Sequence, residues 1–343
     1  MKKTIFSAAL LLCGLLCFGQ QSEPLRIYFV PRTGNTVTPD EMLQQSLWEG
    51  VPDSAPFVLN VPKGNKLFLK TVFRAVYNDK YLFIRVDAEE PLVDKLDFSG
   101  SAPNRDTGAV FNTSHVEFFL DPDLQRKSAG QVVANINGGI YDAIVCGGNS
   151  DWFYDVAVKA EKRKNGWVLA VAFPFQDKGV AVSNVFGMFP HSNPVVGFNA
   201  CRSNSLDGQK ATQWSKTPDN SYDRPNKYGV LVMSGEKNAI GMLQNFLRQR
   251  SDSGITLEGA VKNATEIYRI ALNSALTAGE ANGRMLSEPR RSHVLGEFKA
   301  MRAALTRKAS DAELAGMLSR CGALNAEIAE KQRSLSNNIL DEI

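Results

Sequence analysis

The residues best suited to contact a ligand are two tryptophans that stand in polar segments of the chain. Trp152 follows Asn149-Ser150-Asp151, and Trp214 lies within Thr212-Gln213-Trp214-Ser215. The face of an aromatic ring can stack on the apolar C–H face of a sugar. Trp152 and Trp214 are therefore predicted as ligand contacts, with packing at the rim of the fold as the alternative for Trp152.

Four polar side chains are candidates for hydrogen bonds to such a ligand: Arg202, Asn199, Arg74 and Glu117. Arginine offers a fork of donors and asparagine offers both a donor and an acceptor, which suits ligands rich in hydroxyls. For Arg202 a structural ion pair is the alternative. Glu117 is expected either to accept from sugar hydroxyls or to neutralise Arg202.

Catalytic and metal-binding patterns find little support in the sequence. The three histidines have no serine, cysteine or metal-ligand partner at a useful spacing. A carboxylate pair for glycoside hydrolysis needs two side chains in one cleft, which the sequence alone cannot identify. No catalytic residue is predicted, and a non-catalytic protein is expected.

Glu117 belongs to the clearest strand of the chain. Val116, Phe118 and Leu120 alternate with polar neighbours, the period of a strand with one face in a core. Asp121-Pro122-Asp123 ends it, because proline cannot donate to a ladder and aspartate favours turns.

Further short strands recur through residues 26–233 with turn residues between them. Tight hairpins are expected at Asn137-Gly138-Gly139 and at Asn165-Gly166, whose residues suit two-residue turns. The pattern predicts an antiparallel β-sandwich or barrel. A short helix is expected over Pro39 to Ser46 and a long surface loop over Asp87 to Phe111. The other expected strands cover residues 25–30, 67–76, 81–86, 131–136, 140–145, 152–160, 167–173, 195–201 and 228–233.

From Ser234 onward the apolar residues recur with helical periodicity, and residues 236–343 are predicted to form an all-helical region. Ser310 and Glu313 form a capping box at the start of the last of four expected helices. The region is expected to pack as a small bundle, or to associate with a protein partner or a second copy of the chain. The last helix has an apolar or cysteine side chain at every seventh position: Leu314, Cys321, Ile328 and Leu335.

Residues 1–19 are predicted to be a signal peptide, because a charged start precedes an apolar run that is too short to span a membrane stably. Lipidation at Cys13 or Cys17 is the alternative, although a leucine precedes each of them. The protein is expected in the periplasm or outside the cell, without a lipid anchor. No later stretch is apolar enough for a transmembrane helix.

The charge of the chain argues against a nucleic-acid partner, and its cysteines argue against a metal site. The chain has 39 basic and 36 acidic residues, and two of the lysines lie in the leader, so the mature chain is nearly neutral. Without a basic stripe and interleaved aromatics, a nucleic-acid partner is not expected. Cys146, Cys201 and Cys321 have no metal-ligand spacing, and a Cys146–Cys201 bridge and free thiols are both open.

Several short motifs occur in a fixed order between residues 26 and 233: Trp48, Tyr81-Leu82-Phe83-Ile84-Arg85-Val86, Val116-Glu117-Phe118-Phe119-Leu120-Asp121-Pro122, Gly166-Trp167, Ala172-Phe173-Pro174, Phe198-Asn199-Ala200-Cys201-Arg202, Trp214-Ser215 and Lys227-Tyr228-Gly229-Val230-Leu231. In this order they resemble family 9 carbohydrate-binding modules and their relatives. The resemblance implies a mainly β protein, an antiparallel sandwich of the wider DOMON-like type, here followed by an all-α region that the resemblance does not cover.

The resemblance also implies a ligand. In the sugar binders of this family two tryptophans grip a terminal sugar, with arginine, asparagine and acidic side chains around it, and some members hold structural calcium. Some DOMON relatives bind haem, for which Met188 and His191 are the available pair. Asn112-Thr113-Ser114 stands where relatives often have paired aspartates, so the ligand differs or the site is degenerate.

Two functions from different classes are therefore expected. The first is an exported, non-catalytic carbohydrate-binding protein whose partner is a saccharide or polysaccharide. The alternative is a structural or assembly protein whose sandwich no longer binds sugar and whose helices recruit a protein partner.

Overall fold

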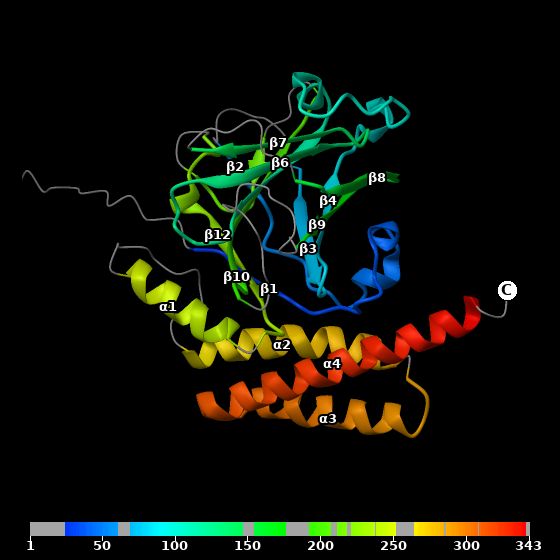
Figure 1. The fold of residues 1–343 in the computed structure, drawn as a ribbon, viewed down its shortest axis with the longest axis vertical. Coiled ribbons are helices and arrows are strands. Elements are labelled where there is room, and N and C mark those ends of the chain that lie inside the picture. The colour runs from blue at the N-terminus through cyan, green and yellow to red at the C-terminus, as the bar shows by residue number, and fades with distance from the viewer. Residues whose placement is uncertain are drawn as a thin grey trace, which may run out of the picture.

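The computed structural model describes residues 25–60, 69–146, 154–175, 192–206, 211–217, 221–236, 238–251, 264–284, 286–307 and 309–340. Within these ranges two β-sheets face each other, and α-helices lie beneath them in the view of Figure 1. The strands lie between Ile27 and Met233, and the first α-helix begins at Ala239. The predicted β-sandwich followed by a helical region is confirmed.

The larger sheet has the strand order β1-β12-β10-β5-β6-β7, with β11 and β2 attached beside β10. Neighbouring strands of this sheet pair antiparallel, with one exception: β1 pairs parallel with β12. The strands are β1 (Ile27–Val30), β2 (Val58–Leu59), β5 (His115–Asp121), β6 (Ala129–Asn135), β7 (Ile140–Val145), β10 (Val195–Ser203), β11 (Thr212–Gln213) and β12 (Gly229–Met233).

The smaller sheet has the order β3-β4-β9-β8 and is antiparallel throughout. Both predicted hairpins of this sheet are present: Asn78 accepts from the N–H of Lys80 and Tyr81, and β8 turns into β9 at Lys164 and Asn165, one residue before the predicted Asn165-Gly166 turn. The strands are β3 (Thr71–Tyr77), β4 (Tyr81–Glu89), β8 (Ala157–Arg163) and β9 (Gly166–Pro174).

The core between the sheets is rich in aromatic rings. Phe73 packs edge-on to Phe198 with ring centres 5.3 Å apart, and Phe118 packs edge-on to Phe173 at 5.5 Å. Such edge-to-face contacts add to the free energy of apolar burial. The alternation Val116, Phe118, Leu120 points into this core, as its period predicted.

The connections differ from the sequence expectation in two places. The segment predicted as one helix over Pro39 to Ser46 forms two 3-10 helices, Pro39–Glu41 and Gln45–Trp48. The expected loop after residue 87 begins later, because β4 runs to Glu89, and it contains the 3-10 helices Val93–Lys95 and Gly108–Asn112.

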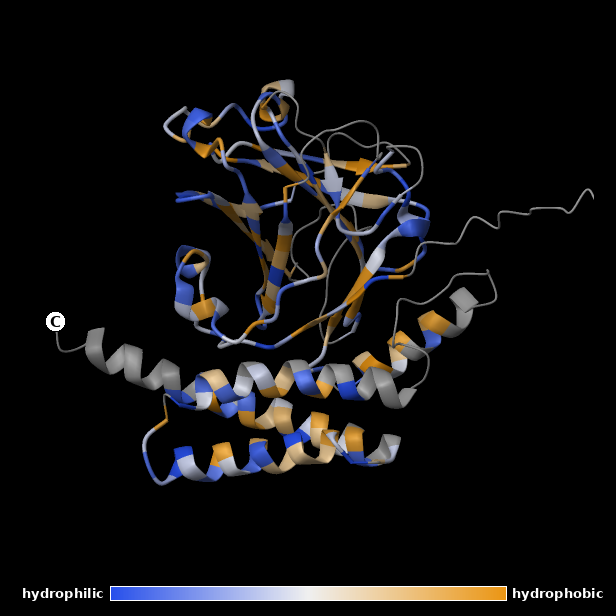
Figure 2. Ribbon diagram, turned by 180° about the vertical axis from the view of Figure 1, so that it is seen from behind, coloured by the Kyte–Doolittle hydropathy of each residue, from blue (hydrophilic) through white to orange (hydrophobic). Residues whose placement is uncertain are grey.

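The helices cover one part of the outer face of the larger sheet. They are α1 (Ala239–Ser251), α2 (Ala264–Gly283), α3 (Arg290–Leu305) and α4 (Asp311–Leu340). Figure 2 shows hydrophobic residues recurring along α1 and α3 between hydrophilic ones, the pattern of helices with one buried face. Outward-facing Phe29, Val230 and Val232 form one cluster with Leu243 and residues of all four helices. The helices and the sheet therefore share a core.

The apolar repeat of α4 is buried inside this shared core. Leu314, Cys321 and Ile328 are each at most 1% exposed, and the side chain of Leu335 lies outside the described residues. The capping box is present, since Ser310 and Glu313 bond each other's backbone N–H. In the described part of the chain no helix is both long and apolar enough to cross a membrane.

A polar cluster joins the two parts of the chain where β12 leads into α1. Glu236 accepts from the guanidinium of Arg32 at 3.1 Å and from the hydroxyl of Tyr77 at 3.0 Å. Arg32 also pairs with Asp79 and lies over the Tyr77 ring. These contacts fix the direction in which the chain leaves the sandwich.

One carboxyl at the end of β5 is buried with little compensation. Asp121 is 1% exposed and accepts from the N–H of Arg126 at 3.0 Å, while its Oδ1 has no partner within the described residues. Burial, together with a hydrogen bond with Asp123, raises the pKa of Asp121 to about 8. The folded protein therefore holds a proton here that the unfolded chain releases near its ordinary value.

This proton makes stability depend on pH. A group whose pKa is raised by folding contributes stability below its unfolded pKa, and that contribution is lost as the pH rises through the folded value. Asp121→Asn should therefore gain stability relative to the unmodified protein between pH 5 and pH 8, by about 1 kcal/mol or more, since one pKa unit is worth about 1.4 kcal/mol. Urea unfolding at several pH values measures the difference, and the exposed Asp155→Asn serves as control. Equal pH dependence in both proteins would contradict the assignment.

The shared core predicts that the sheet depends on its helices. Leu243 is fully buried between α1 and the sheet, so Leu243→Ala should lower the free energy of unfolding by about 2–5 kcal/mol. Gly241→Ala in the same helix is the matched control, because its added Cβ meets no atom within 4 Å. It should be neutral or stabilising by up to about 1 kcal/mol. If Leu243→Ala had the same free energy of unfolding as Gly241→Ala, α1 would not be part of the core.

Candidate functional site

The candidate site lies on the outer face of the larger sheet, on β5, β6 and β7. Because Val116 and Phe118 point into the core, the intervening His115 and Glu117 point outward. Glu117 stands between Cys201 of β10 and Val133 of β6 in the register of the sheet. A continuous sheet thus fixes the position of a carboxylate on its surface.

Glu117 is nearly buried, and it contacts the amide of Gln131 and the imidazole of His115. It is 7% exposed, and its Oε2 accepts from the Nε2 of Gln131 at 2.7 Å. Its Oε1 lies 3.7 Å from Nε2 of His115. Among the described residues no lysine or arginine pairs with Glu117. A carboxylate withdrawn from water without a cation is costly, which favours a role other than packing.

An exposed aromatic ring packs against the histidine that lies next to this carboxylate. Phe111 is 38% exposed, and its ring packs edge-on to His115 at 5.4 Å and to Tyr141 of β7 at 5.2 Å. Two contacts hold the 3-10 helix that carries it: Val110 is fully buried, and its carbonyl accepts from Asn135 at 3.1 Å. Phe111 is therefore an exposed side chain on a firmly anchored turn.

Asn135 also shapes the hairpin beneath Phe111. Its Oδ1 accepts from the backbone N–H of Asn137 and Gly139, which closes the β6–β7 turn. Gly138 in this turn has φ of +83°, a conformation that favours glycine. The predicted Asn-Gly-Gly hairpin is confirmed, and one side chain links it to the turn of Phe111.

The segment that follows residue 220 borders the site beside Glu117. Tyr222 packs against Phe119 at 6.1 Å, and the carbonyl of Asp223 accepts from the thiol of Cys146 at 3.2 Å. Burial raises the pKa of Asp223, and repulsion by Glu117 raises it further. Two carboxylates therefore face the same surface.

Trp214 is not a surface residue, so its predicted role as a stacking ring is wrong. The ring is 1% exposed and packs at 5.2 Å from Phe73 and 5.7 Å from Phe198 in the core between the sheets. Gly229 makes room for it, since a Cβ there would lie 2.5 Å from Cζ3 of Trp214. The polar residues around Trp214 suggested a loop, but Thr212 and Gln213 form the short strand β11, and Trp214 directly after it points into the core.

Arg202 is also turned inward, and its ion-pair alternative is the one observed. Its guanidinium donates to Glu90 at 3.3 Å and to Thr71 at 3.1 Å, and it lies 5.2 Å from the Trp167 ring. Burial lowers the pKa of Arg202 to about 10, against the opposing effect of Glu90. The expectation that Glu117 neutralises Arg202 is wrong, because the two side chains point to opposite faces of the sheet.

The other predicted residues lie apart from one another. Asn199 is fully buried. Its Nδ2 donates to the carbonyl of Ser215 at 2.9 Å, and its Oδ1 accepts from the N–H of Ser215 at 2.7 Å. Arg74 belongs to the smaller sheet and pairs with Asp53 at 2.7 Å. Trp152 lies outside the described residues. Of the predicted residues that the structure describes, Asn199 and Glu117 both point to the outer face of the larger sheet, and of these two only Glu117 keeps any exposure.

Among the described residues the cysteines form no bridge and no metal-ligand cluster is present. Cys146, Cys201 and Cys321 are free thiols, so the bridge between Cys146 and Cys201 is not formed. In the ranges that the structure describes, no three His, Cys, Asp or Glu side chains come together as metal ligands would. Calcium remains an expectation from the resemblance, and Met188 and His191 lie outside the described residues.

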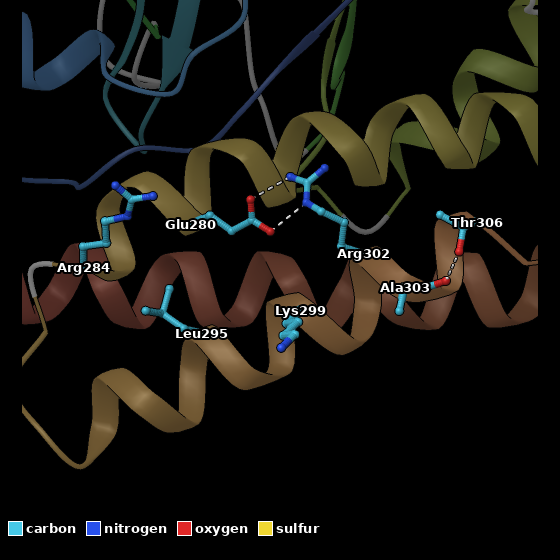
Figure 3. Close-up of a pocket in the computed structure, with 7 residues that line it drawn as sticks. All are labelled: Glu280, Arg284, Leu295, Lys299, Arg302, Ala303 and Thr306. Atoms are coloured by element: carbon cyan, nitrogen blue, oxygen red, sulfur yellow. Dashed lines mark hydrogen bonds and ion pairs between the residues drawn. The ribbon is translucent and has the colours of Figure 1, made fainter.

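A groove between α2 and α3 is a separate feature (Figure 3). Glu280 and Arg302 face each other across it, with Nε and Nη2 of Arg302 at 2.7 and 2.9 Å from the carboxylate oxygens. Asn273 takes a further donor of Arg302 at 2.8 Å. Arg302 is satisfied within the protein, and the described lining of the groove, which also includes Arg284 and Lys299, contains no aromatic ring on which a ligand could stack.

Phe111, His115, Gln131 and Tyr141 were not predicted as site residues. One signal was available in the sequence: an aromatic residue ends a polar loop, six positions before the glutamate of a strand with alternating polarity. The contribution of Gln131 and Tyr141 depends on strand register, which becomes visible only in the structure.

Comparison with known proteins identifies the sandwich. A family model described as "Carbohydrate family 9 binding domain-like" matches residues 45–236, from the second 3-10 helix to just after β12. The comparison with curated proteins returned no match.

Three solved structures are similar in fold. A protein from Bacteroides uniformis, described as a candidate carbohydrate-binding protein, has a TM-score of 0.48 and 15% identity, covering 61% of this chain and 99% of its own. A family 9 carbohydrate-binding module from Caldicellulosiruptor kristjanssonii in complex with cellotriose has a TM-score of 0.40 and 14% identity, covering 61% and 93%. A family 9 module from the same organism in complex with glucose has a TM-score of 0.39 and 13% identity, and the match covers 61% of this chain and 95% of that module.

The inward position of Arg202 predicts a structural phenotype. Removing one partner of a buried ion pair leaves the other charge without compensation, so Arg202→Ala and Glu90→Ala should each lower the free energy of unfolding by about 3–5 kcal/mol. Arg74→Ala, which breaks the partly exposed pair with Asp53, is the control and should cost less than about 1 kcal/mol. Urea unfolding distinguishes them. Comparable losses for Arg202→Ala and Arg74→Ala would contradict the role of the buried pair.

Proposed function

Because the chain belongs to the carbohydrate family 9 binding domain-like family, we propose that it is a non-catalytic saccharide-binding protein. The observation that carries the proposal is the exposed ring of Phe111 in contact with His115, the residue whose Nε2 lies 3.7 Å from the nearly buried carboxylate of Glu117. Members of such families bind sugars on preformed surfaces, where a few polar groups set the orientation of the ligand.

The chemistry of this face suits a sugar ring. Phe111 offers an aromatic surface for the C–H face of a sugar, and its contacts with His115 and Tyr141 hold the ring in place. Oε1 of Glu117 is the acceptor for a sugar hydroxyl, because Oε2 is taken by Gln131. An aromatic ring and an oriented acceptor on a rigid sheet bind without rearrangement, which reduces the entropic cost of association.

The proposal includes two points that concern residues outside those described. Trp152 is proposed as a further stacking ring, in the segment that follows Cys146 and precedes Tyr154. The protein is proposed to be exported through the leader of residues 1–19, so that it meets saccharides in the periplasm or outside the cell. Mass spectrometry of the mature N-terminus tests the second point.

Affinity electrophoresis and calorimetry test the binding site. The first probes are glucose and cellotriose, the sugars named for the similar modules, together with soluble β-glucan and xylan. Phe111→Ala should weaken binding about fivefold or more, because a stacked ring contributes on the order of 1 kcal/mol beyond its area. Glu117→Gln should weaken it as well, because a charged acceptor is replaced by a neutral one.

The matched control is Leu92→Ala. Leu92 is 41% exposed, the other large apolar side chain exposed in the described chain, and it lies away from Glu117 on the loop after β4. It should bind as the unmodified protein does. Retained affinity in both Phe111→Ala and Glu117→Gln, with all variants folded by thermal melting, would place the site elsewhere.

A further inference from the structure

The contact between His115 and Glu117 brings two hydrogen-bond acceptors face to face. Nδ1 of His115 lies 2.7 Å from the carbonyl oxygen of Thr113. A carbonyl oxygen only accepts, so Nδ1 carries a hydrogen whatever the charge of the ring. In the neutral imidazole Nε2 is then an acceptor, and it lies 3.7 Å from Oε1 of Glu117.

Two acceptors at this distance leave room for one shared donor. The space can be filled by a proton on Nε2, which makes an imidazolium paired with the carboxylate, or by a hydroxyl hydrogen from a ligand. Both side chains are little exposed, 5% for His115 and 7% for Glu117, so the unfilled arrangement is unfavourable.

None of the other described residues next to the His115 imidazole supplies a charge or a second proton to the space between Nε2 and Oε1. The neighbouring positions on β6 and β10 are Asn135 and Ser203, which are uncharged. The ring of Phe111 stands edge-on to the imidazole at 86°, and β6 supplies the neutral amide of Gln131 to Glu117.

Further titratable groups face Glu117 rather than the imidazole. Cys201 lies beside Glu117 on β10, and burial followed by the charge of Glu117 raises the pKa of its thiol, which keeps it neutral. Asp223 adds negative charge near Glu117, and Arg224 partly offsets that charge. Tyr222 borders the same carboxylate, and burial raises its pKa above its ordinary value. His115 is therefore the one group here whose ordinary pKa lies near neutrality.

We infer that a proton on His115 and a saccharide hydroxyl compete for the same position against Glu117, so that saccharide binding weakens as the pH falls. This inference rests on the proposed function of the Phe111–Glu117 face. At pH 7.5 the sugar hydroxyl donates its one hydrogen to Oε1 of Glu117, and no proton on Nε2 competes for that oxygen. At pH 5.5 the imidazolium occupies Oε1, and Nε2 has become a donor.

Calorimetry with cellotriose at pH 7.5 and pH 5.5 measures the effect on binding. The dissociation constant should rise about threefold or more at the lower pH, because histidine is the side chain type whose charge changes in this range of pH. His115→Gln should remove the difference. His293→Gln, a change in an exposed histidine of α3, should retain it and serves as the matched control. Equal affinity of the unmodified protein at both pH values overturns the inference and leaves the proposed function standing.

A measurement without ligand tests the pair itself. NMR titration of the His115 imidazole should give a lower pKa in Glu117→Gln than in the unmodified protein, because the imidazolium loses its carboxylate. An unchanged value overturns the inference whether or not cellotriose binds. If cellotriose is not bound at either pH while the titration shows the pair, the proposed function fails for that sugar, and the acid–base contact stands.

Discussion

The buried pair between Arg202 and Glu90 is the interaction on which the arrangement of the two sheets depends. Arg202 reaches from the larger sheet across to Thr71 and Glu90 of the smaller one. Asn204 extends the network, donating to Glu90 at 2.7 Å and contacting Ser114, the residue before β5. A charge that holds the sheets together thus also fixes the start of the strand that carries the candidate site.

The outer face of the larger sheet serves two purposes. Its β1 and β12 side is apolar and lies against the helices (Figure 1). Its β5, β6 and β7 side carries Glu117 and Gln131, and Tyr141 of β7 contacts the ring of Phe111. The same alternation within a strand supplies both surfaces, since the outward positions are valines on β12, whereas on β5 they are three polar residues and Phe119. The helical region is therefore a cover for one half of a sheet as well as an appendage to it.

Local patterns predicted the elements well and the site poorly. The alternation around Phe118, the turn at Gly138 and the repeat of Leu314 each depend on neighbours in sequence, and the structure has all three. Whether Trp214 and Arg202 face solvent depends on which side of β10 and β11 meets the other sheet. Polar neighbours in the sequence suggested exposure, but the register turns both side chains into the core.

Phe111 is an exposed residue of the candidate site that the sequence did not predict. It ends a segment that reads as a featureless loop, and its position follows from a hydrogen bond between Asn135 and the carbonyl of Val110. That contact joins residues far apart in sequence and leaves no periodic trace. Resemblance to a family located the sandwich, but the residues on its surface had to be found from strand pairing.

The parallel pairing of β1 with β12 has a consequence for how the chain acquires its structure. β12 is the last strand of the sandwich and lies between β1 and β10. During synthesis β1 emerges first and has no partner in the sheet until β12 follows. Contacts between such distant segments form slowly, because a long loop must close before they repay its entropy. The exposed edge of β1, with Phe29 beside it, is therefore a surface that a chaperone can hold until the last strand arrives.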